Sequence, residues 1–177
     1  MNTLTVTFTA LVSRIEFEHE FEFTDSETEQ DVKQAIADAW NDEADEDDVR
    51  NATANDVEIL AFDCSEYEGQ ETSDYDKMMK EKFDLYTFAE YYCNNDYNND
   101  FDLLEAAFEC DIQPSDVDEA YSGKYDDDED FAYEMALQMG DIKKDVHWPY
   151  TCIDWEQAAR ELMYDYSESN GYYFRNF

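Results

Sequence analysis

The sequence carries 48 Asp and Glu residues against 11 Lys and Arg residues, which gives a formal net charge of −37. Charge of this density opposes compaction, most strongly at low salt, because like charges repel each other. It also excludes two classes of function. A protein that neutralises nucleic-acid phosphates needs a basic face, and anionic lipid surfaces repel an acidic protein. We therefore expect neither direct nucleic-acid binding nor membrane association.

Despite this charge, the chain has the composition of a folded protein. Of its residues, 43% are hydrophobic and 16% are aromatic, whereas disordered chains are poor in aromatic and β-branched residues. No apolar run approaches the roughly 18 to 20 residues of a membrane-spanning helix. The N-terminus also lacks the pattern of a secretory signal. We therefore expect a folded protein located in the cytoplasm of its host cell.

Three explanations account for such acidity: adaptation to high salt, storage of cations, or a surface that imitates a polyanion. Duplex DNA carries one charge per 1.7 Å of axis, so 37 net charges correspond to about 60 Å of duplex. A compact globule of this length has a radius of gyration of only about 16 Å. We therefore predict an elongated molecule, because a compact one is too small to display its acids at the spacing of DNA phosphates.

An alternating pattern predicts a β-hairpin at the N-terminus. Apolar residues alternate with Thr over residues 4–12, and Glu alternates with apolar residues over 15–23 after a short turn at Ser13–Arg14. His19 falls on the apolar side, where we expect a structural role. The second strand aligns four carboxylates about 7 Å apart, close to the spacing of successive phosphates. We interpret this row as an imitation of phosphates, with a solvated sheet face as the alternative: Glu16, Glu18, Glu20 and Glu22.

A helix and a third strand are expected to complete an N-terminal α+β domain over residues 1–70. Ser26 with Glu29 resembles a capping box, and apolar residues follow at helical spacing up to Trp40. The acidic run 42–48 then ends the helix and has the composition of a loop. Residues 57–62 are predicted to form the third strand.

The rest of the chain is predicted to form a helical middle domain, 71–140, and a small α/β C-terminal domain, 141–177. In the middle domain, helices are expected up to residue 92, over 101–108, from Pro114 to Gly123, and over 127–139. In the C-terminal domain, Asp154 is expected to cap a helix, and Gly171 to open a final strand over 172–177. The predicted fold class is therefore α+β, with three domains in an elongated arrangement.

The sequence gives little support for an enzymatic function. The chain has only two histidines, and a nucleophile pair of His147 with Cys152 has no supporting motif. The four glycines are isolated, which excludes phosphate-binding loops, and no Cys or His pair has zinc-ligand spacing. Residues 96–102 alternate like a calcium loop, but Phe101 and Ala107 replace its essential Gly and Glu. We expect no enzyme, no cofactor, no dedicated metal site, and four free, mostly buried thiols.

Several motifs together resemble one known family. They are Ala120–Tyr125, the acidic stretch Asp127–Asp130 leading into Phe131–Ala132, then Gly140, Ile153–Glu156 with Ala159–Leu162, and Gly171–Phe174. Their order is similar to that in the ArdA antirestriction family, and residues 57–63 weakly resemble the segment that closes its first domain. The resemblance covers residues 100–177 well and 20–70 loosely. Residues 1–15 lack the Tyr and Gly typical of the family's first strand.

This resemblance implies a DNA-mimicking inhibitor of type I restriction-modification enzymes, of the kind that plasmids, phages and conjugative transposons encode. It implies a partner surface on the methyltransferase core and a homodimer formed through the last domain. The acids expected to imitate DNA are the glutamates of the second strand together with Asp126, Asp127, Asp128, Asp130 and Glu134. The residues expected at the dimer interface are Trp148, Ile153, Trp155, Tyr172 and Phe174, whose apolar surface exceeds what so small a domain buries by itself.

Two alternatives to this function stay open. The same mimicry can be directed at another nucleic-acid-binding target, such as a CRISPR effector or a nucleoid protein. Acidity can also be an adaptation to high salt, in which case the protein should unfold in dilute buffer, whereas a mimic should stay folded.

Overall fold

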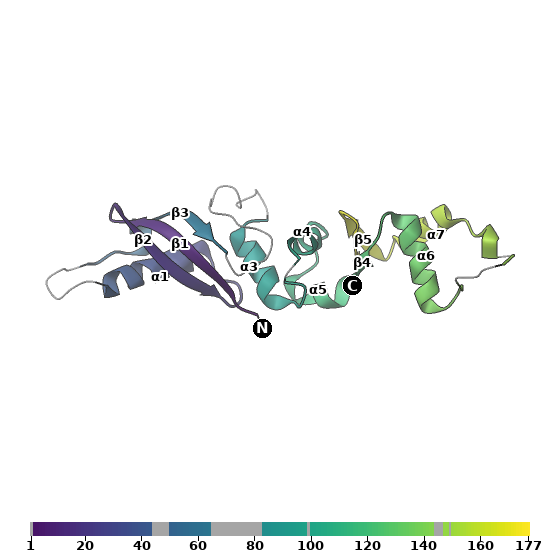
Figure 1. The fold of residues 1–177 in the computed structure, drawn as a ribbon, viewed down its shortest axis with the longest axis horizontal. Coiled ribbons are helices and arrows are strands. Elements are labelled where there is room, and N and C mark those ends of the chain that lie inside the picture. Colours follow the sequence, from purple (N-terminus) through teal and green to yellow (C-terminus); the bar gives the residue numbers. More distant parts are fainter. Residues whose placement is uncertain (1, 44–49, 65–82, 99, 144–146, 149) are drawn as a thin grey trace. The chain divides into compact units, whose positions relative to one another are not determined.

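The computed structural model describes residues 2–43, 50–64, 83–98, 100–143, 147–148 and 150–177. The described residues form a mixed α+β protein with six α-helices and two three-stranded antiparallel sheets (Figure 1). The chain divides into two compact units, Met1–Leu104 and Glu105–Phe177, each of which is described by itself. The mixed α+β class is confirmed, and the division into three domains stays a prediction.

The first sheet contains the predicted hairpin. Strands β1 (Leu4–Val12) and β2 (Ile15–Phe23) pair along their whole length, and β3 (Val57–Asp63) pairs with the other side of β1. Ser13 and Arg14 join β1 to β2 with φ of 54° and 71°. Two such left-handed residues are what a tight hairpin turn of the type I′ class requires, because its twist matches that of the strands. The hairpin, its turn and the third strand are thus confirmed.

The N-cap of helix α1 (Glu29–Asp42) lies two residues later than predicted. Thr28 is the N-cap: its side chain accepts a hydrogen bond from the backbone N–H of Asp31, and the Asp31 carboxylate accepts one from the Thr28 N–H at 2.8 Å. This reciprocal pair has the spacing of a capping box. The predicted box of Ser26 with Glu29 is therefore wrong, because Thr28 and Asp31 offer the same spacing one half-turn further on.

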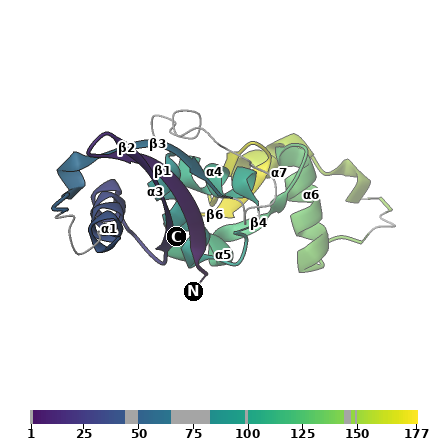
Figure 2. The ribbon, with the colours of Figure 1, turned by 60° about the vertical axis from the view of Figure 1, so that its left-hand side comes forward.

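Helix α1 covers the apolar face of the first sheet (Figures 1 and 2). That face and the inner side of α1 form a continuous core of fully or almost fully buried side chains: Leu4, Val6, Phe8, Ala10, Val12, Phe23, Val32, Ile36, Ala37 and Trp40. The alternation of buried and half-buried residues along β1 follows the period of two of a strand with one face in the core. The opposite face of the same sheet is therefore left to the polar residues.

Two further helices add to the core of the first unit. Helix α3 (Leu85–Asn94) contacts β1 and β2, and its Tyr86 ring lies 6.1 Å from that of Phe23. Helix α4 (Phe101–Glu109) begins in this unit, with Phe101 packed 5.4 Å from the rings of both Phe83 and Phe88. Both predicted helices are confirmed over these bounds. The expected helical residues 75–82 lie outside the described part of the chain.

The second unit contains a small sheet and two longer helices. Its elements are a 3-10 turn (Pro114–Asp116), α5 (Val117–Ala120), β4 (Tyr121–Lys124), α6 (Asp128–Met139), a second 3-10 turn (Tyr150–Cys152), α7 (Trp155–Leu162), β5 (Tyr166–Ser169) and β6 (Tyr172–Arg175). Their sheet has the order β4-β6-β5. The predicted helices over 127–139 and after Asp154 are confirmed, and both begin at an Asp cap.

The predicted helix from Pro114 to Gly123 is wrong in its last three residues. Helix α5 ends at Ala120, and the next four residues form β4, which pairs with β6. Gly123 has φ of 126°, a conformation that no α-helix contains, and the register of β4 against β6 shifts at this point. Pairing with a strand almost fifty residues away has replaced the local helical tendency.

The structure contains a strand, β5, that we did not predict from the sequence. It is joined to β6 by Asn170 and Gly171, which have φ of 53° and 83°. Asn-Gly is the commonest pair for a two-residue hairpin turn, so this signal was present in the sequence.

In the described part of the chain, no helix combines the length and the apolar composition needed to cross a bilayer.

Candidate functional site

The glutamates of β2 form one row on the polar face of the first sheet. All four are exposed, and each lies opposite a half-buried residue of β1, in the pairs Glu22–Thr5, Glu20–Thr7, Glu18–Thr9 and Glu16–Leu11. We call these four residues the glutamate row. Successive members are about 6.8 Å apart along the strand. The row therefore sits on a hydrogen-bonded element rather than on a loop.

Strand β3 adds acids to the same face. Glu58 lies opposite Leu11 and Asp63 opposite Thr7, so each is two strands away from a member of the glutamate row. At about 4.8 Å between neighbouring strands, the acids of β3 stand about 10 Å from the row, with neutral side chains between them. The three strands contain no Lys or Arg. Sequence patterns did not indicate Glu58 or Asp63, because only the strand register places them beside the row.

His19 lies on the opposite side of β2 from the row. Its ring stacks on Phe17 with centroids 6.4 Å apart, and it is half-buried opposite Phe8. Desolvation lowers the pKa of His19, although the charges of Glu20 and Glu43 act in the other direction. The structural role expected for this histidine fits its position against the core.

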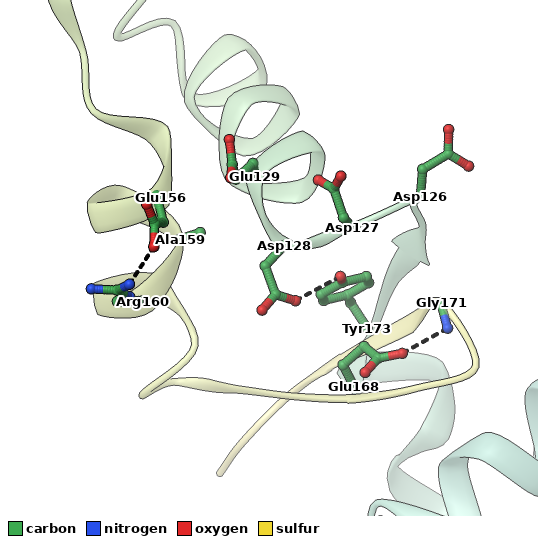
Figure 3. A pocket seen from close by; sticks show the side chains of 10 residues that line it. All are labelled: Asp126, Asp127, Asp128, Glu129, Glu156, Ala159, Arg160, Glu168, Gly171 and Tyr173. Atoms are coloured by element: carbon green, nitrogen blue, oxygen red, sulfur yellow. Dashed lines mark hydrogen bonds and ion pairs between the residues drawn. The ribbon is translucent and has the colours of Figure 1, made fainter.

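The second unit contains an acidic hollow with a cavity volume of about 470 Å³ (Figure 3). Six carboxylates and one guanidinium line it, together with Ala159, Gly171 and Tyr173. The charged residues come from the segment that leads into α6, from the first turn of α6, from α7 and from β5: Asp126, Asp127, Asp128, Glu129, Glu156, Arg160 and Glu168. We call this site the acidic hollow.

Hydrogen bonds fix three of the carboxylates in the acidic hollow. Asp127 caps α6 by accepting from the Asp130 N–H at 2.8 Å, and Glu168 accepts from the Gly171 N–H at 2.7 Å. Asp128 accepts from the buried Tyr173 hydroxyl at 2.8 Å (Figure 3). Burial raises the pKa of Tyr173, and its hydrogen bond to Asp128 raises it further, so the hydroxyl stays a donor. These acids thus have defined positions.

The predicted acids of α6 are only partly gathered at this hollow. Asp126, Asp127 and Asp128 line it, whereas Asp130 is exposed and Glu134 half-buried on α6 outside its lining. Glu156 and Glu168 were not predicted as site residues. The Asn-Gly turn that follows Glu168 was the available signal, because a hairpin there brings β5 beside the start of α6.

Several of the described cations are engaged by groups of the chain itself. Lys33 pairs with Glu29 at 2.5 Å, and Arg160 pairs with Glu156. Arg50 lies 4.1 Å from the centre of the Trp40 ring, and Lys124 lies 4.2 Å from that of Tyr172 and donates to its hydroxyl. Of the basic side chains that the structure describes, Arg160 lines the acidic hollow and none belongs to the strands of the first sheet.

The residues predicted for a dimer interface have different environments. Tyr172 and Phe174 are 4% and 0% exposed, because β6 is the central strand of its sheet and both rings lie against Tyr121 of β4. They offer no surface to a second copy. Trp155 is half-buried against Tyr133, and Ile153 is half-buried, whereas Trp148 is 80% exposed. Dimerisation itself stays a prediction.

The described residues contain no group of three or more His, Cys, Asp or Glu side chains arranged to hold a metal ion. All four cysteines are free: Cys64 and Cys93 are buried, Cys110 is half-buried and Cys152 is exposed. Burial raises the pKa of Cys64 to about 12 and that of Cys110 to about 11, which keeps both as thiols. His147 and Cys152 both lie at the surface.

Comparison with known proteins returned no match, whether to family models, to curated proteins or to solved structures.

Proposed function

We propose that this chain is a DNA-mimicking antirestriction protein that occupies the DNA-binding groove of type I restriction-modification enzymes. The observation that carries the proposal is the glutamate row, four exposed carboxylates evenly spaced on a strand with no Lys or Arg in its sheet. A duplex presents fixed and regular negative charge, and a basic groove recognises that charge largely without regard to sequence. Carboxylates on a rigid strand provide the same feature.

Two further observations support the proposal. The acids Glu58 and Asp63 widen the charged face beyond a single row, and the acidic hollow adds a second group of positioned carboxylates. The strand orders the backbone of the glutamate row, and hydrogen bonds fix three carboxylates of the acidic hollow, so less conformational entropy is lost when a partner binds than with acids on a loop. The methyltransferase core is the expected contact, and we include the homodimer, the elongated shape and a host-cytoplasmic location in the proposal.

Competition tests the proposal directly. A labelled duplex carrying the recognition site is bound to a purified type I methyltransferase, and the protein is titrated in at several salt concentrations. We expect displacement of the duplex, with log affinity for the protein falling roughly linearly with log salt as counterions are released. A failure to displace DNA would contradict the proposal. A flat salt response would contradict the imitation of phosphates even if displacement occurred.

A pull-down from host lysate identifies the target. Recovery of restriction-modification subunits supports the proposal as stated. Recovery of a CRISPR effector or a nucleoid protein in their place keeps the mimicry and replaces the partner.

A further inference from the structure

Strand β2 leaves one edge of the first sheet open. The sheet order is β2-β1-β3, and the nine residues of β2 pair with β1 in an uninterrupted register. Within the described part of the chain, no strand pairs with the other side of β2, so its outward N–H and C=O groups form a template for an added strand. Natural sheets often protect such an edge with charged side chains, with Pro or with a bulge. Strand β2 contains no Pro and no bulge, and its charged side chains are all acidic and lie on one face, so they oppose an acidic strand and not a basic one.

The apolar side of this edge is incompletely covered. Ile15 is 56% exposed, and Phe17 and Phe21 are half-buried, whereas Phe23 at the end of the strand is fully buried. Trp40 of α1 reaches Phe17 with ring centroids 5.4 Å apart. Apolar side chains from a strand added beside β2 would lie next to Ile15, Phe17 and Phe21 and reduce their contact with water.

The charge of the glutamate row determines which kind of strand can pair with this edge. In an antiparallel pair, residues directly opposite each other share a face, with Cβ atoms about 5 Å apart. A second copy of β2 would place Glu against Glu, and like charges at that distance destabilise the pair. A strand that carries Lys or Arg on the same face would form opposite-charge pairs with the glutamate row. Its alternate residues must be apolar to cover Ile15, Phe17 and Phe21.

We propose that the open edge of β2 binds an extended segment of a basic partner protein, in which Lys or Arg alternate with apolar residues, as a fourth strand of the sheet. Backbone hydrogen bonds supply the attachment, and the glutamate row selects the basic sequence. The inference rests on the proposed function only for the nature of the partner, a protein that uses basic residues to hold nucleic acid. It adds which structural element of that partner meets the row.

Peptide binding tests the pairing with the full-length protein. The probe is a capped nine-residue peptide of alternating Arg and Val, and its control has the same composition with the alternation scrambled. We expect the alternating peptide to bind at least about fivefold more tightly, since the scrambled one meets only part of the charged row. Equal affinities would overturn the proposal, because charge attraction alone would then account for binding.

Backbone methylation separates strand addition from other modes of docking. Two further peptides carry N-methyl groups on alternate residues, one on the Arg positions and one on the Val positions. In an added strand only one of these sets donates to β2, so one peptide should lose binding and the other retain it. Hydrogen exchange should show new protection at alternate β2 amides. Equal effects of the two methylation patterns, or no new protection, would overturn the proposal.

A matched pair of variants tests the role of the row. E18Q/E20Q removes two carboxylates from β2, and D38N/D42N removes two exposed carboxylates from α1. We expect about a fivefold loss of peptide affinity from the first and less than about a twofold loss from the second. Equal losses would count against selection by the row.

The outcomes distinguish this inference from the proposed function. Peptide addition at β2 without DNA displacement would leave the edge site intact and remove the antirestriction function. DNA displacement without protection of β2 amides would leave the function intact and remove the strand-addition mode.

Discussion

The surroundings of His19 and Gly123 restrict which other residues can replace them. His19 faces the core side of an otherwise acidic strand, and Gly123 adopts φ of 126° beside the Tyr125 ring. Neither carries a charge that contributes to the glutamate row or the acidic hollow. Substitution of either residue therefore tests the stability of the sheets that position the acids.

We expect His19 to make folding pH-dependent. Its pKa is lowered in the folded protein by desolvation, so the unfolded chain binds more protons in the range just below the ordinary value of about 6.5. Stability is therefore complete above that value and decreases as the pH falls through the window below it. Urea unfolding of the wild type and of H19Q between pH 5 and 7.5 checks this. An equal pH dependence in H19Q would show that other groups cause it.

We expect Gly123→Ala to destabilise the protein more than Gly140→Ala. A Cβ at Gly123 would lie 2.7 Å from Cε2 and 2.9 Å from the hydroxyl oxygen of Tyr125, in addition to the unfavourable positive φ. Gly140 has φ of 81° and no atom within 4 Å of such a Cβ. The loss should be about 2 to 3 kcal/mol at Gly123 and about 1 kcal/mol at Gly140. Denaturant unfolding measures both, and equal losses would argue against the contact with Tyr125.

Strand β2 and the start of helix α6 position their acids by different means. In β2 the period of a strand spaces the carboxylates evenly and the hydrogen-bonded ladder with β1 keeps them in place. At the start of α6, Asp127 caps the helix, and the acids of the first turn lie where the helix dipole favours negative charge. The acids at the start of α6 therefore contribute to local stability as well as to surface charge.

We expect that replacing the glutamate row by four Gln weakens inhibition more than neutralising four acids of the run 42–48. Both variants lose four charges, so a difference reports on geometry. Acids on a rigid strand keep their positions at low entropic cost, whereas acids in a segment with the composition of a loop contribute mainly to long-range steering. Residues 44–48 lie outside the described part of the chain.

DNA displacement from the methyltransferase measures inhibition by both variants, with circular dichroism to show that each is folded. Equal losses of inhibition would mean that only total charge counts.

The whole molecule combines a net charge of −37 with large apolar side chains at its surface. In the second unit, Trp148 is 80% and Tyr164 is 84% exposed. Contiguous exposed apolar surface marks interaction sites, which makes these two aromatic side chains candidates for a subunit contact. The buried Tyr172 and Phe174 are not part of that surface.

We expect a homodimer that depends on Trp148. Burial of this indole in a subunit interface would remove apolar surface from water and stabilise the pair, and higher salt should favour association by screening the repulsion between acidic subunits. Sedimentation of the wild type and of W148E at micromolar concentration checks this. A monomeric wild type would reject the dimer, and a dimeric W148E would place its interface elsewhere.

The amino-acid sequence by itself determined the elements whose signals are local. The alternation over residues 4–23 predicts the hairpin and its exposed glutamates, because in a strand each residue's face depends only on its position. The Asp cap and Gly140 likewise define α6 from neighbouring residues, since cap hydrogen bonds span only a few positions.

Only the tertiary structure decided what depends on residues distant in the chain. Tyr121–Lys124 became a strand because β6 offers backbone partners, although the local sequence favours helix. The register of β3 placed Glu58 on the same face as the glutamate row, and the β5–β6 hairpin placed Glu168 at the acidic hollow. The same sheet buried Tyr172 and Phe174 within their own unit. Such contacts form only when chain segments meet in space, and no local period or spacing encodes which segments those are.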